Sequence, residues 1–217
     1  MKKVALIVAG GNGKRMNSEI PKQFLQIHNE PILIRTIKEF NHFEEIILVL
    51  PKKQFKYWKE ISENANFKPP VILVAGGKNR FQSVKNGLAR INNMSIVAIH
   101  DGVRPCISKT LIDRLISKTK KGLGIIPVIP IQDSLRKITG NKSKHINREN
   151  LYQVQTPQCF ISTDIKNSYN QTFSKKFTDD ASVFEQYGGK IKTISGESKN
   201  LKITTSEDLK LAEILMQ

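Results

Sequence analysis

Short apolar runs alternate with longer amphipathic stretches along most of the chain. The apolar runs predict buried strands at 4–9, 45–50, 71–75, 95–99 and 123–128, and a last short strand at 190–194. Apolar residues at helical spacing predict helices at 31–43, 54–64, 80–91, 111–121, 163–173, 179–187 and 206–216. Continuous apolar strands separated by helices are typical of an α/β fold. We therefore expect a mostly parallel, twisted sheet with helices on both faces.

Glycine or charge follows three of these strands directly, at 10–15, 76–80 and 101–104. In an open parallel sheet, ligands bind at the carboxyl ends of the strands. The pattern therefore predicts one site built from three loops.

The loop after the first strand is typical of a phosphate site. Gly10, Gly11 and Gly13 leave the backbone open to an anion, and the cations Arg15 and Lys22 follow. The spacing matches neither the P-loop nor the GxGxxG dinucleotide pattern. The loop alone therefore predicts a nucleotide triphosphate site, with an ordinary turn carrying solvated cations as the alternative.

A polar segment near 132–148 differs from the rest of the chain. Leu135, Lys137 and Thr139 alternate with other polar residues and a Gly-Asn pair follows, which predicts a β-hairpin. Such a hairpin has little apolar surface of its own. We expect it to be a projecting arm that pairs with another subunit.

The length of 217 residues predicts one domain, 1–217, with the arm as an appendage. No apolar stretch approaches the roughly 20 residues of a membrane span. The N-terminus resembles the basic and apolar parts of a signal peptide but runs into GGNGKR, so we interpret it as the first strand of a cytoplasmic protein. Cys106 and Cys159 lack metal-type or redox-type spacing and are expected to be free thiols.

The formal net charge of +16 raises the hypothesis of a polyanionic partner. The lysines are scattered over many segments, however, and no common nucleic-acid-binding module is evident. We expect neither a nucleic-acid nor a membrane partner. A basic, non-catalytic nucleic-acid binder remains the alternative from another functional class.

Seven sequence blocks carry a resemblance to a known family. They are VAGGNGKRM, PKQFL, AGGKNRFQSV, HDGVRPCI, RENLYQVQTPQCF, FTDDASVFE and NLKITTSEDLKLAE. In content and order they resemble the 2-C-methyl-D-erythritol 4-phosphate cytidylyltransferases of the non-mevalonate isoprenoid route. The resemblance implies a Rossmann-like nucleotidyltransferase fold, CTP and a polyol phosphate as substrates, Mg²⁺ as cofactor, and a homodimer formed through the arm.

The resemblance also implies roles for individual residues. Arg15 and Lys22 would stabilise the transition state, and Ala9, Gly10, Gly11, Gly76, Gly77, Ser83 and Asp101 would bind the nucleotide. Asp101 would lie at the ribose or at the metal, directly or through water. The second-substrate residues would be Arg104, Arg148, Thr156, Thr178 and Lys202, with Arg148 reaching the site of the neighbouring subunit.

Several positions depart from the family pattern. Lys78 stands where an acidic residue lies near the base, Ser198 and Lys199 stand where an acidic residue helps to hold the polyol, and Gly102 replaces alanine. These changes leave the base and hydroxyl contacts open. The closest alternative is a cytidylyltransferase for ribitol 5-phosphate, which shares the loop and the NLKITT ending, whereas TDDASVFE and HDGVRPC favour the isoprenoid family.

Three other polar positions have structural interpretations. Asp101 could serve only as a helix cap, because an aspartate after a strand often does so. His100 is expected to be structural, because an attacking phosphate needs no general base at neutral pH. Asp179 and Asp180 are expected to cap the helix that follows them and to complement its dipole.

Overall fold

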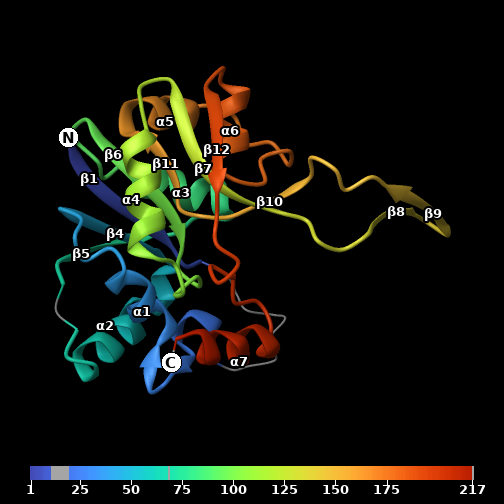
Figure 1. Ribbon diagram of the computed structural model, residues 1–217. Helices are drawn as coiled ribbons and strands as arrows, with labels where there is room; N and C mark the ends of the chain where they lie inside the picture. Colours follow the sequence, from blue (N-terminus) through green and yellow to red (C-terminus); the bar gives the residue numbers. More distant parts are fainter. Residues whose placement is uncertain (11–19, 68, 217) are drawn as a thin grey trace.

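The computed structural model describes residues 1–10, 20–67 and 69–216. Its described part contains one large mixed sheet (Figure 1) with the strands β1 (Lys2–Val8), β4 (Glu45–Leu50), β5 (Val71–Ala75), β6 (Ser95–Asp101), β7 (Leu123–Pro130), β10 (Tyr152–Val154), β11 (Gln158–Ile161) and β12 (Lys190–Ser195). The central order is β6, β1, β4, β5, and all of these pairs are parallel. The predicted, mostly parallel α/β sheet is confirmed.

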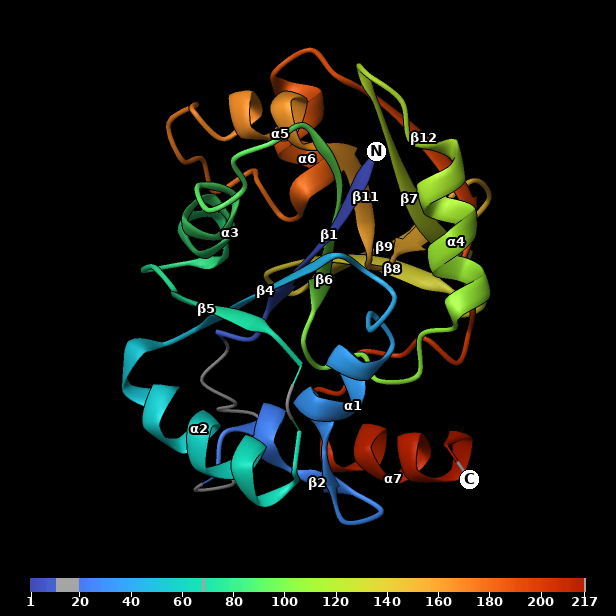
Figure 2. The same cartoon turned by 90° about the vertical axis from the view of Figure 1, so that its left-hand side faces the viewer.

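Alternate side chains of β1 supply the two halves of the core. Val4 and Leu6 pack with apolar residues of α3 (Arg80–Leu88), α5 (Ser162–Ser168) and α6 (Asp180–Gln186). Ala5 and Ile7 pack with α1 (Ile32–Lys38), α2 (Phe55–Asn64) and α4 (Lys109–Lys118). Figure 2 shows these two helix groups on opposite faces of the sheet. The period of two along a strand thus explains why β1 is continuously apolar from Val4 to Val8.

All seven predicted helices are present, but some of their ends differ. The helix expected over 31–43 ends at Lys38, because the amides of Phe40 and Asn41 donate to carbonyls only three residues back, those of Ile37 and Lys38. The strand expected over 95–99 continues to Asp101, which pairs with Val8 of β1. His100 and Asp101 therefore lie within a strand and not in a loop.

Several short elements were not predicted. β10 and β11 run antiparallel to β7, and β2 (Gln26–Ile27) and β3 (Glu30–Pro31) form a small hairpin. The 3₁₀ turn η2 (Lys22–Phe24) precedes this hairpin, and the 3₁₀ turn η3 (Lys52–Gln54) follows β4. The last helix, α7 (Ser206–Leu215), packs its Ala212 in one cluster with Ile27 and Ile203.

The expected hairpin corresponds to β8 (Leu135–Thr139) and β9 (Lys142–Ile146), paired from Leu135↔Ile146 to Thr139↔Lys142. Gly140 in its turn has a φ of 56°, a conformation that favours glycine. The hairpin projects from the body of the chain (Figure 1), and the Ile138 side chain on it is 74% exposed. Among the described residues, no helix is both long and apolar enough to cross a bilayer.

Candidate active site

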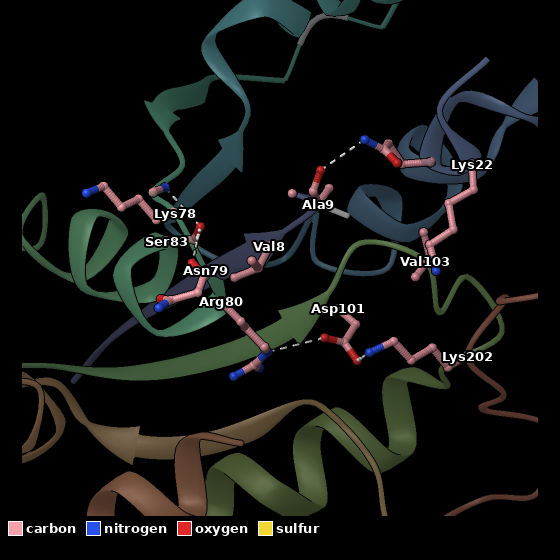
Figure 3. Close-up of a pocket in the computed structure, with 13 residues that line it drawn as sticks. Val8, Ala9, Lys22, Lys78, Asn79, Arg80, Ser83, Asp101, Val103 and Lys202 are labelled. Carbon is pink, nitrogen blue, oxygen red and sulfur yellow. Dashed lines mark hydrogen bonds and ion pairs between the residues drawn. The ribbon is translucent and has the colours of Figure 1, made fainter. Parts of the chain in front are cut away.

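A cleft of about 300 Å³ opens at the carboxyl ends of β1, β5 and β6. Seven of the residues expected at the site line it: Ala9, Gly10, Lys22, Gly77, Ser83, Asp101 and Lys202. Figure 3 shows how they converge from separate segments of the chain. The three strand ends expected to meet do meet here. Arg15 and Gly11 lie outside the described residues.

The loop after β5 is held in shape by hydrogen bonds from the start of α3. The Ser83 hydroxyl accepts from the Gly77 amide at 3.0 Å and donates to the Asn79 carbonyl at 2.9 Å. The Asn79 side chain caps α3 by accepting from the Gln82 amide at 2.8 Å. A Cβ at Gly77 would lie 2.2 Å from Cγ of Gln82, so this close packing requires glycine. Ser83 therefore shapes the loop that lines the cleft.

Lys22 enters the cleft from η2 and is 9% exposed. Its Nζ donates to the carbonyl of Ile203, the residue after Lys202, at 2.9 Å. The adjacent Gln23 donates to the Ala9 carbonyl at 3.0 Å and to Oε1 of Gln54 at 2.8 Å. Gln23 thus fixes the end of β1. The sequence had not assigned this residue, although it lies in the PKQFL block.

Asp101 is the centre of the charge in the cleft. Its Oδ2 lies 2.9 Å from Lys202 Nζ and 3.3 Å from Arg104 Nε, and its Oδ1 lies 3.7 Å from Arg80 Nε. Arg80 and Lys202 approach it from opposite sides (Figure 3). Burial alone would raise the pKa of Asp101, but Arg80, Lys202 and Arg104 together hold that pKa well below its usual range. Asp101 is therefore ionised and faces a surplus of positive charge.

A second cavity of about 240 Å³ adjoins the cleft and shares Arg80, Asp101 and Lys202 with it. It also contains three of the expected second-substrate residues, Arg104, Thr156 and Thr178. Arg148 is not brought to either cavity. It is exposed in the segment that returns from the arm.

Comparisons with known proteins identify a family and relatives that match almost the whole chain. The model of the IspD family, described as 2-C-methyl-D-erythritol 4-phosphate cytidylyltransferase, matches residues 3–217. The chain belongs to this family. A relative of that name from Bacteroides fragilis is 45% identical over 100% of both chains. Another, from Azobacteroides pseudotrichonymphae, is 47% identical over 99% of this chain and 98% of its own.

Solved structures give the same result for the fold. A 4-diphosphocytidyl-2C-methyl-D-erythritol synthase from Anaerococcus prevotii has a TM-score of 0.81 at 30% identity, covering 100% of this chain and 96% of that one. A 2-C-methyl-D-erythritol 4-phosphate cytidylyltransferase from Thermus thermophilus has a TM-score of 0.79 at 27% identity, covering 99% and 98%. The predicted resemblance to the cytidylyltransferase family is confirmed.

His100 lies behind the cleft of this family member and is fully buried. Its Nε2 donates to the Arg104 carbonyl at 3.2 Å, which leaves Nδ1 to accept from the Thr156 hydroxyl at 3.0 Å. The same hydroxyl accepts from the Asp101 amide at 3.1 Å. Burial lowers the pKa of His100 to about 4, so the ring is neutral at neutral pH. Both ring nitrogens are engaged, in agreement with a structural role.

The two acids at the start of α6 have different roles. Asp179 caps the helix by accepting from the Ser182 amide at 2.9 Å, as predicted. Asp180 does not cap the helix, but it is the first residue of α6 and so places negative charge in the first turn, as expected. Asp180 is fully buried, and its carboxylate accepts both terminal nitrogens of Arg80, at 2.8 and 2.6 Å, and the Tyr169 hydroxyl at 2.6 Å. No role for Arg80 could be predicted from the sequence, because its partner lies 100 residues away.

The residues present fit a metal ion that arrives with a nucleotide. Asp101 is the one carboxylate lining the cleft among the described residues, and these hold no group of three or more acidic, histidine or cysteine ligands. Mg²⁺ is commonly bound by one or two carboxylates together with substrate phosphates. Asp101 at the carboxyl end of β6 suits such shared binding.

Proposed function

We infer that the protein joins CTP and 2-C-methyl-D-erythritol 4-phosphate, giving 4-diphosphocytidyl-2-C-methylerythritol and pyrophosphate. The observation that carries this function is the family match over residues 3–217. The two adjoining cavities with a shared cationic wall support it, because the reaction needs room for two phosphorylated substrates. We therefore propose the activity named for the relatives. The alternatives, a ribitol 5-phosphate cytidylyltransferase and a nucleic-acid binder, are not proposed.

In this reaction an oxygen of the acceptor's phosphate attacks the α-phosphorus of CTP. The bond from that phosphorus to the oxygen bridging to the β-phosphorus breaks, and the electron pair leaves with pyrophosphate. Such a step needs in-line positioning and compensation of charge rather than covalent chemistry by the protein. The surplus of cations in the cleft provides that compensation.

We assign roles to the residues on this basis. Lys22, together with Arg15, stabilises charge growing at the α-phosphate and on the leaving group. Ala9, Gly10, Gly77 and Ser83, which line the cleft, are assigned to nucleotide binding, and the same role is proposed for Gly11 and Gly76. Arg104, Thr156, Thr178 and Lys202 bind the acceptor from the second cavity. The Thr156 hydroxyl proton is donated to His100, so Thr156 would receive a hydrogen bond from the acceptor rather than donate one.

Mg²⁺ is proposed as the cofactor. Asp101 would hold it, directly or through water, together with the triphosphate. When bound, the ion supplies charge neutralisation and a fixed geometry for the phosphates. The ion pair between Asp101 and Lys202 leaves the Lys202 ammonium next to this position, where it can turn to the acceptor's phosphate.

We also propose that the arm formed by β8 and β9 joins two subunits. An isolated two-stranded hairpin is at best marginally stable in water, so this arm needs a surface to pack on. Three apolar side chains are exposed on the arm and on β10, the strand that follows it: Ile138, Tyr152 and Val154. Pairing of two arms would carry Arg148 towards the acceptor cavity of the partner.

A pyrophosphate-release assay tests the proposed function. With CTP and Mg²⁺, release is expected only when 2-C-methyl-D-erythritol 4-phosphate is added. Ribitol 5-phosphate at the same concentration serves as the control, and equal or faster turnover with it would overturn the choice of substrate. An enzyme that releases pyrophosphate with neither acceptor would refute the cytidylyltransferase function itself.

Hybrid dimers test the shared site. Lys22→Ala and Arg148→Ala proteins should each be inactive, and a mixture should regain up to about a quarter of the wild-type activity, because one of the two sites in each hybrid is intact. Native mass spectrometry would establish that the subunits exchange. Proven exchange without recovered activity would show that each site is built within one chain.

A further inference from the structure

Arg80 is the first residue of α3 and follows the loop 76–79 that lines the nucleotide cleft. Its side chain crosses to the acceptor side, where it is 29% exposed and lines the second cavity as well. In Figure 3 it extends from α3 towards Asp101. Arg80 therefore touches both subsites and the carboxylate between them.

The guanidinium group of Arg80 forms a bidentate ion pair with Asp180, called the fork below. Its Nη1 and Nη2 lie 2.8 and 2.6 Å from the two carboxylate oxygens of Asp180, whose side chain is fully buried. Burial alone would lower the pKa of Arg80, but Asp180 and Asp101 raise it above its usual value, so the guanidinium group stays charged. A bidentate pair of this kind fixes direction as well as distance.

Asp180 in turn belongs to the segment that builds the acceptor cavity. It starts α6, directly after Thr178 and Asp179, both of which line that cavity. Gln158 of β11 holds the same turn by donating to Asp179 at 2.8 Å and accepting from the Ala181 amide at 2.8 Å. The fork thus links the start of α3 to the start of α6 beside the shared wall.

We propose that Arg80 is a positioning residue. Through its bidentate ion pair with Asp180 it holds the acceptor cavity at a fixed position relative to the nucleotide cleft, and it orients Asp101 between them. This role rests on the proposed function, because only a reaction between two bound substrates requires the two cavities to be held in a fixed relative position. A buried ion pair is weak as a source of stability, so its geometry is the property that matters here. A displacement of about 1 Å between reacting groups can cost on the order of 100-fold in rate.

Two substitutions separate the fork from the charge. Arg80→Lys keeps the cation and loses the fork, and Asp180→Asn keeps the shape and loses the anion. Each should lower kcat by about 10- to 100-fold and raise the KM for the acceptor. The KM for CTP should stay within about threefold, because Asn79 and Ser83 hold the nucleotide loop independently of the guanidinium group. In the double variant the two losses should not add, since both remove one contact.

Two controls identify a merely structural effect. Arg90→Lys makes the same change at an exposed position just after α3 and should leave all parameters unchanged. Tyr169→Phe removes the third hydrogen bond to Asp180 but spares the fork, so it should lower Tm while kcat, measured well below Tm, remains close to that of the wild type.

The outcomes are distinct. If Arg80→Lys and Asp180→Asn lower Tm without changing kcat, as Tyr169→Phe should, the pair is only structural and the proposal is wrong. If Asp180→Asn does not fold, Arg80→Lys decides alone, because it retains a charge opposite Asp180. A wild-type protein without turnover would overturn the proposed function and this role together, whereas an active wild type with unaffected variants would overturn only the role.

Discussion

Replacing Lys22 by methionine is expected to lower kcat by on the order of 100-fold or more, the usual scale for removing one preorganised donor from a transition state. Lys22 is nearly buried, and its ammonium group is held by the Ile203 carbonyl, so its position is set before the substrate binds. The KM for CTP should change much less than kcat, because the charge that Lys22 compensates grows only during the reaction. Steady-state kinetics at saturating acceptor measure both parameters.

Lys59→Met is the matched control, because Lys59 lies exposed on α2 in a loose pair with Glu63 at 3.9 Å. Its kcat should equal that of the wild type. Arg15→Met is expected to match the loss in Lys22→Met if the two cations act on the same phosphates. A Lys22→Met enzyme with unchanged kcat and a raised KM for CTP would show that Lys22 only binds the nucleotide.

The continuous apolar runs of β1, β4 and β6 made the sheet predictable, because each of these strands is buried on both faces and so carries its own apolar signal. β10 was missed for the opposite reason, because Tyr152, Gln153 and Val154 are exposed. β11 is buried but only four residues long, and the antiparallel pairing of both strands with β7 depends on residues more than twenty positions away. Local patterns carry little information about pairing of that kind.

The residues of the candidate site also fall into a group that the sequence predicts and a group that it does not. Gly10 and Gly77 come just after β1 and β5, and Asp101 is the last residue of β6, so the rule for strand ends in parallel sheets was enough to bring them together. Arg80 and Gln23 are held by partners distant in sequence, Asp180 and Gln54, and nothing beside them in the chain marks those partners. Sequence reasoning therefore found the groups that face the ligand and missed those that hold them.

Asp101→Asn is expected to have large effects on both stability and activity. The change keeps the shape of the side chain but removes the carboxylate that faces Lys202, Arg104 and Arg80. Removing one partner of a buried ion pair costs about 3 kcal/mol or more of the free energy of unfolding. kcat/KM should fall by on the order of 100-fold or more, because Asp101 lies between the two cavities and is the proposed metal ligand.

The pH dependence of this loss has a definite sign. The pKa of folded Asp101 lies below its ordinary value of 3.8, so its contribution to stability is present above about pH 4 and is lost as the pH falls through the folded pKa. The free energies of urea unfolding of wild type and Asp101→Asn should therefore differ at pH 7, and this difference should shrink as the pH falls from about 4 towards the folded pKa.

An exposed aspartate provides the matched control for Asp101→Asn. Asp113→Asn removes the surface pair with Lys109 and should cost less than about 1 kcal/mol.

With Asp101 neutralised, the uncompensated cations should also bind pyrophosphate more tightly, so pyrophosphate should raise the Tm of Asp101→Asn more than that of the wild type. Equal Tm shifts, together with wild-type stability at pH 7, would show that Asp101 does not balance these cations.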